Sequence, residues 1–305
     1  MRPLPLTLLA CTGLAVEGGS WHTATTVPER LQEMHAALHH GRIYIAGGID
    51  STNGAIARAY RFDPAASRWD RIADLPAPRH HMPLAVVGDT LYAVGGLAED
   101  FSGQANFWAY LEDGNVWEAR APLPIGRGAS AVGAAAGKLI VVGGLGPTQA
   151  HVDSTALYDP ATNRWRNAAP LPTPRDHLTA QVANGILYAI GGRPGDANRN
   201  FDLVDAYDPA VDRWTTRAPM PSRRGGLASS VLDGRIHTFG GETNSSVFDN
   251  HEVYDPVANR WSAAPPLPTA RHGLAAAAIG GKIYVIGGGP RAGFAQTGAV
   301  EVFTP

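Results

Sequence analysis

Cysteine is almost absent from this 305-residue chain, which contains a single one, Cys11. A lone cysteine near one end excludes an intramolecular disulfide, and it leaves no thiol nucleophile in the rest of the chain. We therefore expect a fold that is stable without disulfide cross-links.

The sequence also lacks long apolar runs and an excess of charge of either sign. Its most apolar stretches, residues 130–146 and 274–289, are interrupted by Lys138 and Lys282, so neither reaches the roughly 18 residues of a membrane-spanning helix. The formal net charge is −2, whereas binding to nucleic acid or anionic lipid calls for a concentrated basic surface. We expect no membrane span and no nucleic-acid partner.

A sixfold repeat dominates what is present. Tryptophan occupies six equivalent positions, Trp21, Trp69, Trp117, Trp165, Trp214 and Trp261. A glycine pair follows each of them 26 residues later, at Gly47-Gly48, Gly95-Gly96, Gly143-Gly144, Gly191-Gly192, Gly240-Gly241 and Gly287-Gly288. A fixed period near fifty residues is typical of one supersecondary unit copied around a ring or along an array.

Each unit reads as two hairpins. Residues 84–87 and 90–94 are short apolar segments joined by Gly88-Asp89, which predicts two strands and a tight turn. A second hairpin runs from an aromatic residue through a turn such as residues 159–164 to the tryptophan. The 36 glycines and 24 prolines leave little room for long helices. Four antiparallel strands in each unit predict a propeller blade.

Three features together carry a family resemblance: the glycine pair, an aromatic residue seven positions before a tryptophan, and an arginine 16 positions before the pair. The arginine recurs at Arg79, Arg127, Arg175, Arg224 and Arg271. The first repeat departs from the pattern, with Arg30 one position early and Leu31 in the arginine's place. Over about residues 20–305 the chain resembles a bacterial kelch-repeat protein, a six-bladed β-propeller.

The chain ends predict how the ring closes. The last unit stops at residues 303–305, after its third strand, and Trp21 precedes any complete blade. We therefore expect an all-β, six-bladed propeller of four-stranded antiparallel blades, closed by the N-terminal strand joining the C-terminal three strands. The propeller is expected to span residues 18–305 as one domain.

Residues 1–17 read differently. Arg2 and the leucine-rich residues before Cys11 resemble a bacterial lipoprotein export signal, which would place the mature protein in the periplasm or on the cell surface with a lipid anchor at Cys11. A wrongly assigned start or a disordered terminus fits the same residues, because the apolar core is short and contains a proline. A cytoplasmic location therefore stays open.

The repeated residues favour structural roles. The six tryptophans are expected to fill the space between neighbouring blades, because a packed ring needs large apolar area at equivalent places. The glycine pairs are expected to mark positive φ or close backbone approach, since no helix pattern follows them as it would in a phosphate-binding loop. The repeated arginines either brace one blade against the next or present a stripe of charge to a ligand.

Candidate ligand-binding residues are polar positions on one rim of the ring. All length variation between repeats falls in the loop between the second and third strands, which shares a rim with the start of the first strand. Glu33, His151 and His272 are predicted on this rim. From the rim we select eight candidates, His81, Asp176, His177, Arg193, Arg223, Arg224, Glu242 and Arg291. Arginine and histidine beside carboxylates suit a ligand that bears carboxylates or hydroxyls.

No metal, cofactor or catalytic residue is expected from the pattern. No two histidines have the i, i+4 spacing of a zinc-binding helix, and the adjacent pairs His39-His40 and His80-His81 are expected to point to opposite faces of a strand. Some kelch propellers are copper radical oxidases with a Tyr–Cys cofactor, which the single cysteine of this chain excludes.

Two functions fit the sequence. The first is a non-catalytic propeller that binds a protein, or an acidic or carbohydrate small molecule, at the rim, because no nucleophile and base pair stands out from the repeat. The alternative is a carbohydrate-active enzyme similar to kelch-type sialic acid mutarotases, in which Glu242 with Arg193 or Arg224 would transfer protons and grip an anion.

Overall fold

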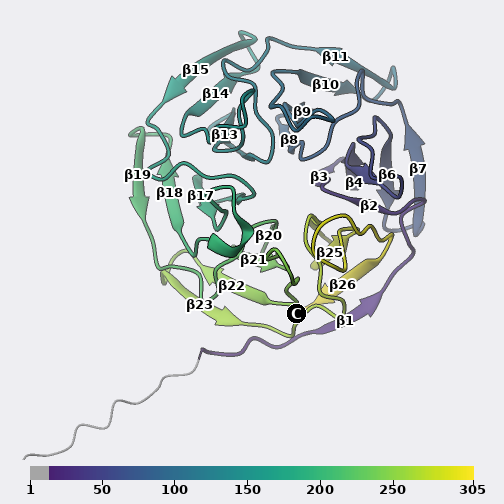
Figure 1. Ribbon diagram of the computed structural model, residues 1–305, viewed down its shortest axis with the longest axis vertical. Helices are drawn as coiled ribbons and strands as arrows, with labels where there is room; N and C mark the ends of the chain where they lie inside the picture. The colour runs from purple at the N-terminus through teal and green to yellow at the C-terminus, as the bar shows by residue number, and fades with distance from the viewer. Residues whose placement is uncertain (1–13) are drawn as a thin grey trace, which may run out of the picture.

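The computed structural model describes residues 14–305 and shows six four-stranded antiparallel sheets arranged around a central axis (Figure 1). The predicted all-β propeller is confirmed. Cys11 and most of the predicted export signal lie outside the described residues. Within residues 14–305, no helix is long and apolar enough to cross a membrane.

The blades take their strands in chain order from the axis outward. Blade 1 contains β3 (His35–His39), β4 (Arg42–Ala46), β6 (Ala59–Asp63) and β7 (Arg68–Ile72). Blade 2 contains β8 (Leu84–Val87), β9 (Thr90–Val94), β10 (Phe107–Leu111) and β11 (Val116–Ala119). Blade 3 contains β12 (Ala131–Ala135), β13 (Lys138–Val142), β14 (Thr155–Asp159) and β15 (Arg164–Ala168).

Blade 4 contains β16 (Thr179–Ala183), β17 (Ile186–Ile190), β18 (Val204–Asp208) and β19 (Arg213–Thr216). Blade 5 contains β20 (Ala228–Leu232), β21 (Arg235–Phe239), β22 (His251–Asp255) and β23 (Arg260–Ala263). Blade 6 contains β24 (Ala275–Ile279), β25 (Lys282–Ile286), β26 (Val300–Thr304) and β1 (Ser20–Thr23). Two short strands, β2 (Leu31–Gln32) and β5 (Ile49–Asp50), pair with each other, and the 3₁₀ turn η1 (Ala197–Arg199) lies in a loop of blade 4.

Ring closure is achieved by the N-terminal strand. β1 runs antiparallel to β26, and Trp21 lies opposite Phe303. The same cross-strand pairing joins Tyr158 to Trp165 within blade 3, so blade 6 reproduces with two chain ends what the other blades build from one segment. With β1 in place, blade 6 has four strands like the other five blades.

The tryptophans fasten each blade to the one before it. In blade 3 the Trp165 indole N–H donates to the Ala121 carbonyl at 2.7 Å, and the Ala121 N–H donates to Asn163 Oδ1 at 3.0 Å. The Tyr158 hydroxyl donates to the same Asn163 oxygen at 2.9 Å. Equivalent indole bonds run from Trp21, Trp117, Trp214 and Trp261. These bonds join five of the six repeated tryptophans to the preceding blade. Within residues 14–305, the Trp69 indole N–H has no hydrogen-bond partner, and its ring packs among apolar residues of blades 1 and 6.

The glycine pairs permit close backbone approach. Gly95 has φ of +62°, and a Cβ there would lie 2.2 Å from the Arg127 carbonyl oxygen of the next blade. Gly96 N–H donates to that same oxygen at 2.9 Å. In the last pair, Gly288 donates instead to the carbonyl of Leu31, the residue that replaces the arginine in the first repeat, at 2.8 Å. The positive φ and the contact together exclude a larger residue.

Four repeated arginines are fully buried, Arg127, Arg175, Arg224 and Arg271. Arg271 donates to the Gly287 carbonyl at 2.6 Å and to Glu301 Oε2 at 2.7 Å, inside its own blade. Because these guanidinium groups are buried and hydrogen-bonded within their own blades, these arginines brace the blades and do not form a charged stripe on the surface.

The propeller's contacts begin before the predicted boundary at residue 18. Ala15 and Glu17 form backbone hydrogen bonds with Ala263 of β23, at 2.8 and 2.7 Å. The Glu17 carboxylate also lies 2.8 Å from Arg235. Residues 15–17 therefore lie along the outer edge of blade 5.

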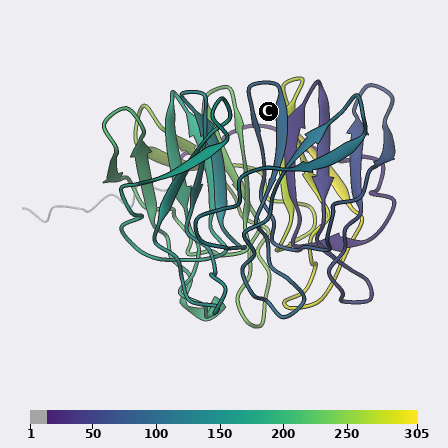
Figure 2. The same cartoon turned by 90° about the horizontal axis from the view of Figure 1, so that it is seen from above.

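The two rims of the ring differ in their loops. The turns that join first to second strands are short, whereas the connections between second and third strands extend further, including η1 at the lower side of Figure 2. We call this second rim the loop face. It is the rim on which the sequence placed the candidate residues.

Candidate functional site

A closed ring of backbone hydrogen bonds surrounds the axis at the loop-face end of the first strands. Each N–H donates to the carbonyl of the equivalent residue in the preceding blade, over 2.7–2.9 Å. The six residues are Glu33, His81, Ala129, His177, Gly226 and Gly273, and all have φ between +50° and +68°. We call this the backbone ring. Its side chains are unconstrained by the repeat, since only the backbone conformation recurs.

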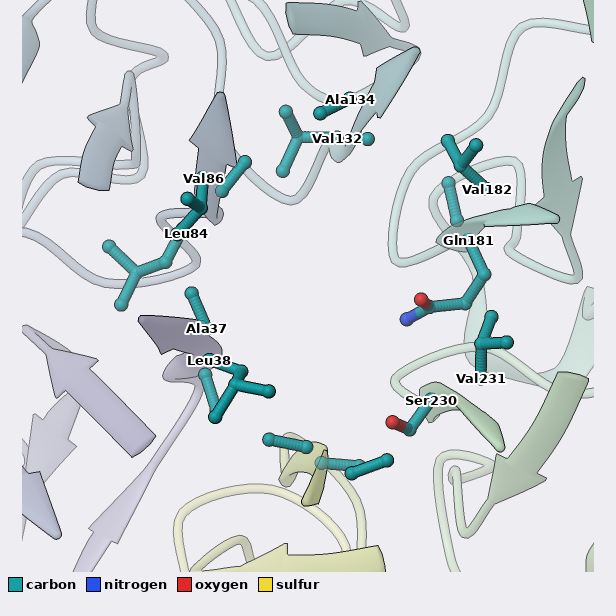
Figure 3. A pocket seen from close by; sticks show the side chains of 17 residues that line it. Ala37, Leu38, Leu84, Val86, Val132, Ala134, Gln181, Val182, Ser230 and Val231 are labelled. Atoms are coloured by element: carbon teal, nitrogen blue, oxygen red, sulfur yellow. The ribbon is translucent and has the colours of Figure 1, made fainter. Parts of the chain in front are cut away.

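The central channel narrows toward the backbone ring. Near the short turns it forms a cavity of about 280 Å³, whose lining includes Leu84, Val132, Val182 and Val231 (Figure 3). Successive segments toward the ring have volumes of about 60 and 20 Å³. Apart from Gln181 and Ser230, the labelled lining in Figure 3 is apolar. The channel itself therefore offers few polar side chains to a ligand.

Polar groups gather instead at the ring. Seven side chains form a closed cycle of contacts that we call the axial cluster: Glu33, His81, His177, Asp176, Arg193, Glu242 and His272.

On one side of the cycle, His81 Nε2 lies 3.0 Å from both Glu33 Oε2 and His177 Nε2. His177 Nδ1 contacts Asp176 Oδ1, which lies 3.4 Å from Arg193 Nε. On the other side, Arg193 Nη1 lies 2.9 Å from Glu242 Oε1.

His272 completes the cycle. Its Nε2 lies 3.4 Å from Glu242 Oε2 and 3.5 Å from Glu33 Oε1. Two residues outside the cycle support it: His151 Nε2 contacts Asp176 Oδ2 at 2.6 Å, and Asn200 donates to the Glu242 carbonyl at 2.6 Å. No side chain of the cycle is more than 11% exposed.

The repeat positions these residues in two ways. Glu33, His81 and His177 are members of the backbone ring, and Asp176 and His272 each adjoin a ring residue. Arg193 and Glu242 each follow a glycine pair directly, at the end of β17 and β21, where they bridge to the first strand of the same blade. The fold therefore brings residues as far apart as 33 and 272 to one point on the axis.

Burial and neighbouring charges set the ionisation of the cluster. Burial would raise the pKa of the Glu33 carboxyl, but His81 and His272 outweigh it and hold that pKa well below its usual range. Likewise, burial of Asp176 is outweighed by His177 and Arg193, which lower its pKa to about 2. Burial and the Arg193 charge lower the pKa of His177.

The formal charge of the cluster follows from its residue types. With neutral imidazoles, three carboxylates (Glu33, Asp176 and Glu242) and one guanidinium (Arg193) leave a charge of −2. The cluster is thus suited to hydroxyl donors and to cations, because carboxylates are acceptors only.

Five of the eight residues selected from the sequence lie in the axial cluster: His81, Asp176, His177, Arg193 and Glu242. Arg224 does not reach it, because it is fully buried and bonded to Gly240 and Glu252 within blade 5. Arg224 is therefore a structural residue and not a ligand-binding candidate. Arg223 and Arg291 are exposed, and Arg223 pairs with Asp202 at 3.3 Å.

Glu33 and His272 were placed on the correct rim by the sequence but were not selected. The signal for Glu33 was its spacing, since it precedes His81 by 48 residues, as His81 precedes Ala129. The prediction that adjacent histidines point to opposite faces of a strand is wrong for His80 and His81. His81 has φ of +50°, so His80 and His81 do not point to opposite faces, and their Nδ1 atoms are in contact.

Comparison with known proteins agrees with this architecture. The chain superposes on the solved structure of YjhT with a TM-score of 0.79 at 17% identity, covering 92% of this chain and 97% of that one. This likeness concerns the fold alone. No curated protein matches the sequence significantly.

Two family models match the sequence. Residues 33–76 match the kelch motif. Residues 118–289, more than half of the chain, match the KLHDC2/KLHL20/DRC7 kelch-repeats domain. With six blades, their repeated tryptophans and glycine pairs, and closure by the N-terminal strand, the chain belongs to the kelch-repeat propeller family.

Proposed function

We propose that this propeller binds a hydroxyl-rich small molecule of the carbohydrate type on its loop face, over the axial cluster. The observation that carries the proposal is the closed cycle of seven polar side chains on the axis, at the rim where all loop-length variation occurs. Kelch propellers provide a binding scaffold, and in this one the non-repeated polar residues converge at a single point.

The charge of the cluster favours hydroxyls over anions. Four repeated arginines are buried inside blades, and Arg193 is shared between Asp176 and Glu242. An anionic ligand would meet the net negative charge of the cluster, whereas sugar hydroxyls can donate to its carboxylates. Of the two ligand classes expected from the sequence, acidic and hydroxylated, the charge of the cluster therefore favours the hydroxylated class.

An aromatic side chain lies beside the cluster. Phe101, on the loop after β9, is 37% exposed, and its ring centroid is 4.7 Å from that of His80 and 6.2 Å from that of His81. An exposed aromatic face next to hydrogen-bonding groups suits the apolar face of a sugar ring.

Binding of a matched pair of probes, galactose and galacturonate, tests the proposal by saturation-transfer NMR and calorimetry. We expect galactose to bind more tightly than galacturonate, and Glu242→Gln and Phe101→Ala each to weaken galactose binding at least tenfold. Arg164→Glu, an exposed change on β15 far from the loop face, should leave binding unchanged. Tighter binding of galacturonate, or no binding of either sugar, would overturn the proposal.

A catalytic role is the second candidate. Glu242 lies between Arg193 at 2.9 Å and His272 at 3.4 Å, so a carboxylate and an imidazole that could exchange a proton with a sugar stand together. Of the two arginine partners expected for Glu242, only Arg193 is in place. Anomer exchange of an acidic sugar, followed by NMR, should be accelerated by the protein and not by Glu242→Gln if the cluster is catalytic.

We also propose that the protein is extracytoplasmic, anchored through Cys11. Residues 15–17 lie on the outer edge of blade 5, away from the axial cluster, which supports an anchor that leaves the site uncovered. Metabolic labelling with a palmitate analogue in a bacterial host, and its loss in Cys11→Ala, tests this. Unlabelled cytoplasmic protein would refute it.

A further inference from the structure

The hydrogen-bond partners fix the tautomer of His177. Its Nδ1 contacts Asp176 Oδ1, and an ionised carboxylate can only accept a hydrogen bond. Nδ1 therefore carries the proton. In the neutral ring, Nε2 is left with a lone pair, and that atom faces His81.

The partners of His80 fix the tautomer of His81 in the same way. His80 Nε2 lies 2.9 Å from the Ala98 carbonyl and must donate to it, so His80 Nδ1 is an acceptor. His81 Nδ1 contacts that atom and must therefore be the donor. His81 Nε2 is then also a lone pair in the neutral ring.

Three lone pairs consequently converge with no proton among them. His81 Nε2 lies 3.0 Å from His177 Nε2 and 3.0 Å from Glu33 Oε2, and all three side chains are at least nine-tenths buried. Buried acceptors that face one another repel unless a positive charge lies between them. We propose that Glu33, His81 and His177 bind one divalent first-row transition-metal ion on the propeller axis.

The two distances of 3.0 Å from His81 Nε2 fit such an ion, and the three ligand atoms all lie within 4.8 Å of one another. Metal–nitrogen and metal–oxygen bonds of about 2.0–2.2 Å place neighbouring ligand atoms about 2.9–3.4 Å apart. Two imidazoles and one carboxylate form a donor set used for divalent iron and zinc, and they leave coordination positions open. The cluster's formal charge of −2 would be balanced by the +2 charge of such an ion.

Supporting contacts orient the ligands as metal sites require. Asp176 accepts from the far nitrogen of His177, and His80 accepts from the far nitrogen of His81. Such partners fix the ring orientation and raise the basicity of the ligand. His272 repeats the pattern, because its Nδ1 faces the Gly289 carbonyl and its Nε2 faces Glu33 and Glu242. This second convergence adds negative potential beside the ion.

The inference deepens the proposed function, since the ion would lie in the same axial cluster and its open positions could take a ligand oxygen. Because the ion would cancel the cluster's charge of −2, the preference for galactose over galacturonate is expected of the metal-free protein. It does not depend on sugar binding. Metal binding is measured without sugar, so its failure and the failure of the sugar proposal are separate results.

Calorimetry and metal analysis of the full chain, stripped with chelator and titrated with Zn²⁺ or Co²⁺, test the inference. We expect one ion per chain. His81→Ala and His177→Ala should each weaken binding at least 100-fold, and Asp176→Asn about 10- to 100-fold through His177. His40→Ala, in a separate group of His39, His40 and Asp89 far from the backbone ring, is the matched control and should bind normally.

A spectroscopic measurement on the unaltered protein tests the inference even if the variants do not fold. Cu²⁺ bound to it should show hyperfine coupling to two imidazole nitrogens. The inference is overturned if the folded protein binds no ion, in which case a single proton shared by His81, His177 and Glu33 supplies the positive charge. It is also overturned if His40→Ala, and not His81→Ala, abolishes binding.

Discussion

Two sets of positions recur around the ring, the buried arginines in four blades and the backbone ring in all six, and they differ in what is repeated. At the buried arginines Arg127, Arg175, Arg224 and Arg271 the side chain itself recurs, together with its bonds to backbone carbonyls. At the backbone ring the conformation and hydrogen bond recur, but the side chains are glutamate, histidine, alanine, histidine and two glycines. The arginine positions, where one side chain recurs, therefore stabilise the fold. The backbone-ring positions, where only the conformation recurs, can carry different side chains and so determine specificity.

The largest effect is expected from a buried arginine. Arg175→Met removes a guanidinium that lies 2.9 Å from both the Gly191 carbonyl and Asp205, and it leaves the Asp205 charge buried without its partner. We expect a loss of about 3–5 kcal/mol in the free energy of unfolding, measured by urea denaturation. The double change with Asp205→Ala should recover part of it. A loss below about 1 kcal/mol for Arg175→Met would contradict the view that the arginine positions stabilise the fold.

The strand β1, which closes the ring, should contribute to stability as the outer strands of the other blades do. Trp21 is half-buried against Phe239 and Phe303, and Trp21→Ala should cost about 2–3 kcal/mol, less than a fully buried tryptophan. The neighbouring exposed residue in the same strand provides the control, since His22→Ala should change stability by less than about 0.5 kcal/mol. Equal melting temperatures for the two variants would contradict closure by β1.

A third prediction concerns charge in the axial cluster and its dependence on pH. The pKa of Asp176 is about 2 in the fold, below the ordinary value of 3.8, so its ionised form stabilises the folded state. This contribution, roughly 2 kcal/mol at most, is present above pH about 4 and is lost as pH falls toward 2.

Asp176→Asn should therefore be least stable relative to the unaltered protein at neutral pH, with the difference closing in acid. Melting temperatures between pH 2 and 7 measure this. Asp113→Asn, which removes an exposed carboxyl from a turn, is the control and should show no such convergence. A deficit that stays constant across the range would show that Asp176 acts through shape and not charge.

The smallest effect is expected at Ala129. This buried alanine has φ of +50° in the backbone ring, where two other blades carry glycine. Ala129→Gly relieves the strain of positive φ but removes a buried methyl and loosens the unfolded chain, so the net change should stay within about 1 kcal/mol. Ion and sugar binding should be unchanged. Loss of either would show that the Ala129 side chain contributes to binding, contrary to the purely structural role of the backbone at this position.

The sequence predicted the blades, the closure and the interblade tryptophans because these depend on one residue type at one spacing. It predicted only part of the axial cluster. Glu33 was hidden because the first repeat has Leu31 in place of the arginine, so its register was harder to see. The contact of His80 with His81 could not be predicted from strand alternation, because His81 has positive φ. Contacts such as Glu33 with His272 depend on ring closure in three dimensions.

The backbone ring also governs the electric field on the axis. Each peptide group carries a dipole of about 3.5 D, and in a helix these dipoles add to give charged ends. Here six of them follow one another head to tail around a closed circle. Vectors arranged in this way nearly cancel, so the scaffold contributes almost no potential of its own at the mouth of the channel. The sign of that potential is set by the side chains at the six ring positions and by neighbours such as Asp176, Arg193 and Glu242. A propeller of this kind can therefore acquire a preference for a cation, an anion or a neutral molecule without any change in its backbone.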